Sequence, residues 1–166
     1  SATTNLSFAL DSITREIRTG HYYYCKSFND ENRPENLPEE DNMPGGEHDG
    51  NCRDSDDANF IAFVRDRDGK KIGYRLKDGS IEQRVQEANN GSYETSWEKL
   101  TSDDITIETF RISTGGSVVY EATSPETDQP VVTLHIKGRV ANKNGLETET
   151  DFNIQTLIVQ RRLDQV

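Results

Sequence analysis

The residues best suited to chemistry are oxygen-bearing side chains within one short stretch of the chain. They are Asp49, Asn51, Asp54, Asp56 and Asp57. A hard cation such as calcium takes about six to eight oxygen ligands, and this stretch could supply several of them. The favoured interpretation is solvated charge without a bound ion, and a calcium site is the alternative. We therefore expect no cofactor, and calcium is the one exception that the sequence offers.

The three histidines are the best test of an enzymatic role. His21 follows a predicted helix, His48 lies in the acidic stretch, and His135 is on the outward face of a predicted strand. Each position favours a solvated surface residue over a general base. The sequence contains no phosphate loop, dinucleotide fingerprint, metalloprotease helix or nucleophile elbow. We therefore expect no enzymatic activity, and a secreted enzyme is the least favoured alternative.

The chain has two cysteines, Cys25 and Cys52, one at each side of a long polar segment. Two unrelated buried thiols are one interpretation. The favoured one is a disulfide, because nothing else in the sequence holds the ends of that segment together. Closing a loop of this length would stabilise the fold by about 3.5 kcal/mol in the chain-entropy model. Such a bond favours an oxidising location, at the cell surface or outside the cell.

The acidity of the chain is concentrated between these cysteines. The 166 residues have a formal charge of −11, and residues 29–57 contain eleven carboxylates against two arginines, or −9. With three prolines and almost no large apolar side chain, this composition cannot offset its ordering entropy by burial. We therefore predict an acidic loop over residues 25–57. The negative charge also argues against nucleic acid and anionic membrane surfaces as partners.

The first twenty residues have the pattern of an amphipathic helix. Leu6, Leu10, Ile13 and Ile17 recur at steps of four, three and four, which gives one apolar stripe. Gly20 stands where a C-terminal helix cap is expected. A single helix of this length is marginal in water, so the stripe must dock on another element. We predict a helix over residues 1–20 whose four stripe residues pack on a sheet.

After the loop the apolar period changes to two. Residues 59–65 are apolar on both faces, which indicates an interior strand, and further alternating segments follow up to about residue 161. Turn signals at Asp68-Gly69 and Asp78-Gly79 separate them, and we expect a bulge between Ile107 and Phe110. Residues 58–166 therefore predict an antiparallel sheet. The whole chain, residues 1–166, is expected to form a single α+β domain.

Four segments, taken in order, resemble the type IV pilin-like family. Residues 9–25, ALDSITREIRTGHYYYC, are similar to the end of the family's N-terminal helix, closest to minor pilins and to J-type or W-type pseudopilins. Residues 100–112 and 129–140 resemble two of its sheet strands. Residues 152–164, FNIQTLIVQRRLD, resemble the closing strand, with its glutamine-arginine pair.

This resemblance implies a structural subunit of a type IV pilus-like or type II secretion pseudopilus filament, in a minor position. Its partners would be other pilin or pseudopilin subunits. The helix would be the second half of a longer one, whose apolar first half anchors the full-length protein in the membrane before assembly. The resemblance also implies an extracellular or cell-surface location. An adhesin-like binding module that uses the acidic loop is the alternative function.

Overall fold

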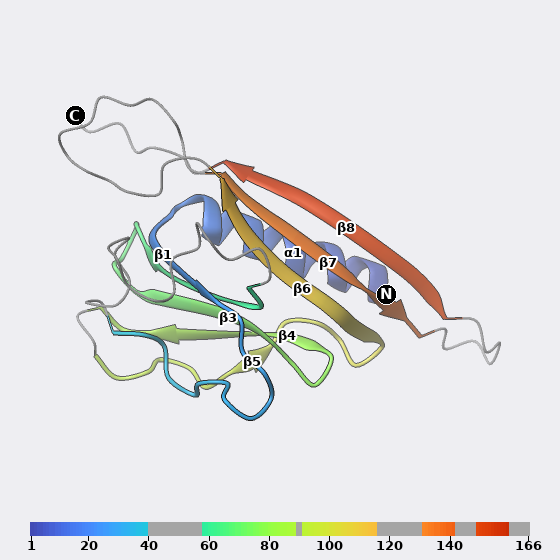
Figure 1. Ribbon diagram of the computed structural model, residues 1–166, viewed down its shortest axis with the longest axis horizontal. Coiled ribbons are helices and arrows are strands. Elements are labelled where there is room, and N and C mark those ends of the chain that lie inside the picture. Colours follow the sequence, from blue (N-terminus) through green and yellow to red (C-terminus); the bar gives the residue numbers. More distant parts are fainter. Residues whose placement is uncertain (40–57, 89–90, 116–130, 142–148, 160–166) are drawn as a thin grey trace.

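A computed structural model describes residues 1–39, 58–88, 91–115, 131–141 and 149–159 (Figure 1). These residues form one helix and two antiparallel sheets. The first sheet has the strand order β1-β2-β3-β4-β5, and the second has the order β6-β7-β8. The elements are α1 (Ala2–Arg18), β1 (Gly20–Lys26), β2 (Phe60–Arg65), β3 (Lys71–Lys77), β4 (Ser80–Gln86), β5 (Glu98–Lys99), β6 (Ile105–Gly115), β7 (Val131–Val140) and β8 (Thr150–Val159). The predicted α+β class is confirmed, with two sheets in place of one.

The helix α1 begins at a polar cap and ends two residues earlier than predicted. The Ser1 hydroxyl accepts a hydrogen bond from the Thr4 backbone N–H, which satisfies one of the free donors at the helix start. The C-terminal cap is Thr19, not Gly20. Gly20 is the first residue of β1, and a Cβ atom there would overlap the Phe63 ring. This glycine is needed for close approach of the backbone, so the prediction of a glycine helix cap was wrong.

The chain then forms a strand where the sequence predicted a helix end and the start of a loop. β1 pairs antiparallel with β2, and its register shifts between His21 and Tyr24. The intervening Tyr22 has a φ of 56° and is exposed, whereas Tyr23 is buried. The predicted boundary of the acidic loop at residue 25 is therefore corrected: the loop starts after Lys26, where β1 ends.

The first sheet follows the predicted pattern of turns and faces. β2 pairs with both β1 and β3, and five of its six residues are buried, as an interior strand requires. The β2–β3 turn has Gly69 at a φ of 69°, and the β3–β4 turn has Asp78 and Gly79 at 49° and 73°. Positive φ at both central residues is the requirement of a two-residue hairpin turn, which the β3–β4 turn meets, whereas the longer β2–β3 turn has positive φ only at Gly69. Both predicted turns are confirmed.

The second sheet is built from three long strands. β7 pairs with β6 and β8 along its whole length, and its register with β6 shifts between Ile107 and Thr109. This shift confirms the predicted bulge. Residues 116–130, which belong to the region of the predicted sheet, lie outside the described residues. The last strand ends at Val159, and the residues from 160 onward are likewise outside them.

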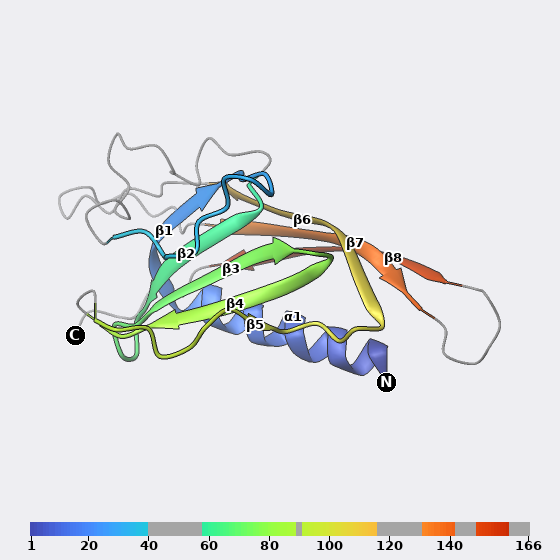
Figure 2. The ribbon, with the colours of Figure 1, turned by 90° about the horizontal axis from the view of Figure 1, so that it is seen from below.

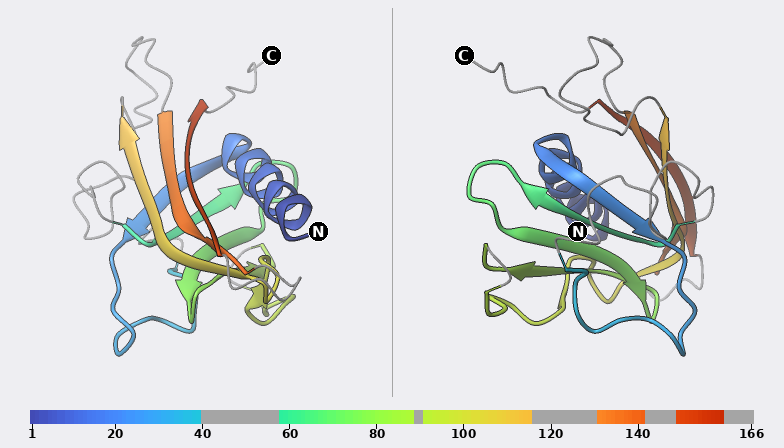
Figure 3. Two further views of the ribbon diagram at one scale, coloured as in Figure 1. Left: turned by 90° about the vertical axis from the view of Figure 1, so that its right-hand side faces the viewer. Right: turned by 60° about the vertical axis from the view of Figure 1, so that its left-hand side comes forward.

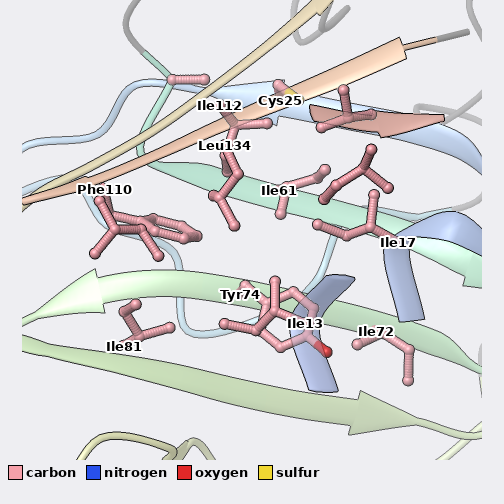
Figure 4. Close-up of a cluster of buried hydrophobic side chains, with 14 of the residues drawn as sticks. Ile13, Ile17, Cys25, Ile61, Ile72, Tyr74, Ile81, Phe110, Ile112 and Leu134 are labelled. Carbon is pink, nitrogen blue, oxygen red and sulfur yellow. The ribbon is translucent and has the colours of Figure 1, made fainter. Parts of the chain in front are cut away.

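The two sheets meet along β6, and α1 lies against both (Figures 2 and 3). The Ile107 N–H donates to the Gly79 carbonyl and the Ile112 N–H to the Ala58 carbonyl, which ties β6 to the first sheet. α1 contacts β1, β2, β7 and β8. The core therefore lies where helix and sheets meet (Figure 4). Within the described residues, no helix has the length and apolar character that crossing a membrane requires.

Candidate functional site

The four predicted stripe residues all face the sheets. Leu6, Ile13 and Ile17 belong to the main buried cluster, and Leu10 is half-buried against it. Ile13 and Ile17 are fully buried among side chains from both sheets, including Ile72, which Figure 4 also labels. Most apolar side chains of the helix lie on this one face, and its mean hydropathy is low. Packing of this face therefore fixes the helix to the sheets.

The opposite face of α1 carries an exposed aromatic side chain. Phe8 is 75% exposed, the highest value among the exposed large apolar residues of the described chain. Its exposed neighbours one turn before and after are Thr4 and Asp11. A large apolar side chain at this level of exposure contributes little to the stability of the fold. Phe8 is therefore available to a partner of the helix.

The predicted disulfide and calcium residues lie mostly outside the described part of the chain. Cys25 is buried at the end of β1 and is not a free thiol. Its predicted partner Cys52 lies outside the described residues. The disulfide between Cys25 and Cys52 is therefore not seen in the described part of the chain and stays a prediction. The same holds for the calcium ligands, which are Asp49, Asn51, Asp54, Asp56 and Asp57. Within the described ranges, no group of three or more His, Cys, Asp or Glu side chains could hold a metal ion.

The start of the acidic loop is not a free loop, because it lies on the outer face of the first sheet, away from α1. We call residues 33–39 the strap. Leu37 is its buried residue and belongs to a second cluster with Phe60, Ala62 and Val64 of β2. Half-buried Tyr93 and Trp97 pack against this cluster. The sequence predicted a loop with too few large apolar side chains to offset its ordering entropy, and Leu37 is the apolar residue through which the strap is nevertheless buried on the sheet.

Cationic and aromatic side chains of the sheet bind the backbone carbonyls of the strap. Lys71 Nζ donates to the Pro38 carbonyl at 2.9 Å, and Arg75 Nη1 donates to the Pro34 carbonyl at 3.2 Å. The Glu35 carbonyl accepts from Trp97 Nε1 at 2.9 Å and also from the Arg84 guanidinium. The Leu37 N–H donates to the Tyr93 hydroxyl at 2.8 Å. We call Lys71, Gly73, Arg75, Arg84, Tyr93 and Trp97 the strap seat.

The cations of the seat are themselves held in place. Arg75 is almost fully buried, and its Nε donates to Glu82 at 2.8 Å. The Arg75 guanidinium also lies 4.0 Å from the centre of the Trp97 ring, and that of Arg84 lies 3.6 Å from the centre of the Tyr93 ring. A buried charge needs such partners, because leaving it unpaired costs several kcal/mol, on the order of 3–5. Both guanidinium groups of the seat therefore have partners within the sheet and its aromatic side chains.

A second group of charges surrounds the β2–β3 turn at the end of α1. Arg65 donates to both carboxylate oxygens of Asp68, at 3.0 and 2.7 Å, and lies 3.4 Å from Glu16 of the helix. The hydrogen bond from Arg65 lowers the pKa of the Asp68 carboxyl to about 2. These ion pairs connect the last turns of α1 to the β2–β3 turn and help to fix the helix direction.

The described histidines have polar partners. His21 Nδ1 pairs with Asp66, and His135 Nε2 lies 2.7 Å from Asn153 Oδ1. Beside His21, burial and the charge of Asp66 raise the pKa of the Tyr23 phenol. The Tyr23 hydroxyl contacts the carbonyls at the helix end, including that of Gly20 at 2.8 Å. These contacts bind the helix end to β1 and do not converge on a reacting centre within the described residues. His48 lies outside those residues.

Sequence reasoning missed the seat, although two signals pointed to it. Gly73 interrupts an otherwise regular strand, and a glycine inside a strand often marks the close approach of another segment. Leu37 is the one large aliphatic side chain between two prolines of the acidic stretch, Pro34 and Pro38. Neither signal identifies its partner, because the two residues are far apart in the chain.

Comparison with known proteins gives one family. The family model described as "PpdB: Prepilin peptidase-dependent protein B" matches residues 2–156, which include α1 and nearly all of both sheets. The search of curated proteins found no match, and neither did the search of solved structures.

Proposed function

Because the chain belongs to the prepilin peptidase-dependent protein B family, we propose that it is a structural subunit of a type IV pilus-like or type II secretion pseudopilus filament. In this proposal it is a minor subunit without enzymatic activity. Its partners are other pilin or pseudopilin subunits, and its location is the cell surface or outside the cell. The family match over residues 2–156 is the observation that carries the proposal.

The two faces of α1 support assembly by helix packing. One face is used inside the domain, where Ile13 and Ile17 are fully buried. The other face presents Phe8 at 75% exposure among small polar residues. Such an aromatic side chain contributes most of its binding energy when a partner removes it from water. We infer that a helix of a neighbouring subunit packs on this face.

The full-length protein would continue α1 toward the N-terminus. In this proposal, an apolar half-helix upstream of Ser1 anchors the precursor in the membrane before assembly, and a span of this kind needs about 20 apolar residues. The strap would remain on the outer face of the first sheet, opposite α1. Contact with a ligand through that face is the alternative function, as an adhesin-like binding module.

Site-specific cross-linking in cells tests the proposal. The photoreactive analogue p-benzoyl-phenylalanine replaces Phe8 in the full-length protein, and a second variant carries it in place of Leu157, which is also exposed but lies on β8. We expect adducts at position 8 with a second pilin-type protein, identified by mass spectrometry, and fewer at position 157. Adducts at position 8 only with proteins that lack a pilin-type helix would overturn the proposal, as would their complete absence.

A further inference from the structure

We propose that the strap seat is a peptide-binding site, which the chain's own residues 33–39 occupy. Its ligand class is a segment with the pattern Pro-x-x-Leu-Pro, as in Pro34 to Pro38, which bends at residues 35 and 36. A partner that presents such a segment would take the same position and displace the strap. This inference does not depend on the filament function, because it rests only on how the strap is bound.

The contacts recognise a peptide backbone. Lys71, Arg75, Arg84 and Trp97 all donate to carbonyl groups of the strap, and Tyr93 accepts from one of its N–H groups. Such bonds depend on the backbone shape and the carbonyl spacing of the segment, and they do not require that it be joined to this domain. Docking of proline-containing segments against aromatic side chains is a recurrent mode of peptide recognition.

Leu37 supplies the side-chain specificity. It is 5% exposed and lies over Gly73, where a Cβ atom would overlap its Cδ2 atom. The prolines on either side have no N–H to leave unpaired, and their fixed φ restricts the free segment at two positions. The entropy lost on binding is therefore reduced for this sequence. A leucine between two prolines, at this spacing, is the feature that a competing partner must share.

The seat is formed without any residue of the strap. Lys71, Gly73 and Arg75 lie on β3, Arg84 lies on β4, and the aromatic residues lie between β4 and β5. Glu82 and the two aromatic rings hold the guanidinium groups. The Glu35 carboxylate of the strap also lies 3.8 Å from Arg75 Nη1, but the other contacts of both guanidinium groups persist when the strap is replaced. We therefore expect these two donors to stay in position for a peptide in solution. In the intact chain the strap is covalently attached, so its effective concentration is about millimolar and it keeps other ligands out.

Fluorescence anisotropy with a labelled peptide tests this site. The peptide has the sequence of residues 31–41, ENRPENLPEED, and the main variant has residues 33–39 replaced by a glycine-serine linker of equal length. We expect the peptide to bind this variant saturably. Its affinity for the intact protein should be lower by about tenfold or more, because the attached strap competes with it. Arg84→Ala in the linker variant, or Leu→Asp in the peptide, should weaken binding by about tenfold. Two results with a folded linker variant would overturn the proposal. One is equal binding of the original and the Leu37→Asp peptide, and the other is binding of neither peptide.

A second measurement applies to the intact chain and covers the case in which the linker variant does not fold. Excess peptide must displace the strap, so hydrogen exchange at the Leu37 amide should accelerate when the peptide is added at millimolar concentration. The Leu→Asp peptide is the control and should leave that rate unchanged. An exchange rate at Leu37 that does not respond to the original peptide would contradict a separable site.

Discussion

Leu37 of the strap occupies the space in which a side chain at Gly73 would lie. The two residues come from an acidic, proline-containing segment and from the middle of β3, and they are in contact because residue 73 has no Cβ atom. The strap can therefore lie flat on the sheet, within reach of Lys71 and Arg75.

Gly73→Ala should destabilise the protein by about 1–3 kcal/mol, because the added methyl group overlaps a packed side chain. The measurement is the free energy of unfolding in urea. In the double variant with Leu37→Ala, the added methyl group has space. We therefore expect the double variant to lose less free energy of unfolding than the sum of the losses in the two single variants. Full additivity would mean that the two residues do not contact each other in solution.

Ile13→Ala should lower the free energy of unfolding by about 2–5 kcal/mol, because it leaves a cavity among buried residues of both sheets. Phe8→Ala on the same helix is the matched control, and we expect a change within about 0.5 kcal/mol. Urea denaturation of both variants gives the comparison. Similar losses for the two would show that the exposed face of α1 is already packed within the domain.

Asp68→Asn tests the ion pair with Arg65. The pKa of Asp68 is lowered to about 2 in the folded protein, so its contribution to stability is present above its ordinary pKa and is lost as the pH falls toward 2. Because the side chain is partly exposed, we expect a loss of about 1 kcal/mol or less at pH 7. The free energies of unfolding of the variant and the unsubstituted protein should converge as the pH falls from about 4 to about 2. A difference in the free energy of unfolding that does not change with pH would exclude an ionic contribution of Asp68.

The predicted bond between Cys25 and Cys52 can be measured directly by thiol alkylation and intact mass. We expect no alkylation of the non-reduced protein and two modified thiols after reduction. Reduction should lower the stability by about 3–4 kcal/mol, because the closed loop is long. Two modified thiols in the non-reduced protein would exclude the bond.

The sequence predicted those elements whose apolar pattern is local. The stripe of α1, the interior strand β2 and both hairpin turns follow from neighbours within a few residues. The strand β1 was not predicted, because a bulge at Tyr22 breaks the alternation of apolar and polar residues in its first half. A bulge changes which side chains face inward, so a period-two pattern does not survive it.

The strap could not be predicted for a different reason. Its composition is that of a solvated loop, and the side chains that bind its backbone come from residues more than 30 positions away, such as Lys71 and Trp97. Buried Lys71 and Arg75 look like exposed charges on a strand until the strap covers them. Long-range pairing of polar groups leaves no periodic trace in the sequence, whereas apolar burial does.

The family assignment is tested most directly by the N-terminus of the full-length protein. The precursor, with its native upstream residues, is produced in cells with and without prepilin peptidase, and the N-terminal residue is determined by intact mass and sequencing. We predict a shortened N-terminus that appears only in cells with the peptidase. The same N-terminus in both strains would contradict the assignment of this chain as a pilin-type subunit.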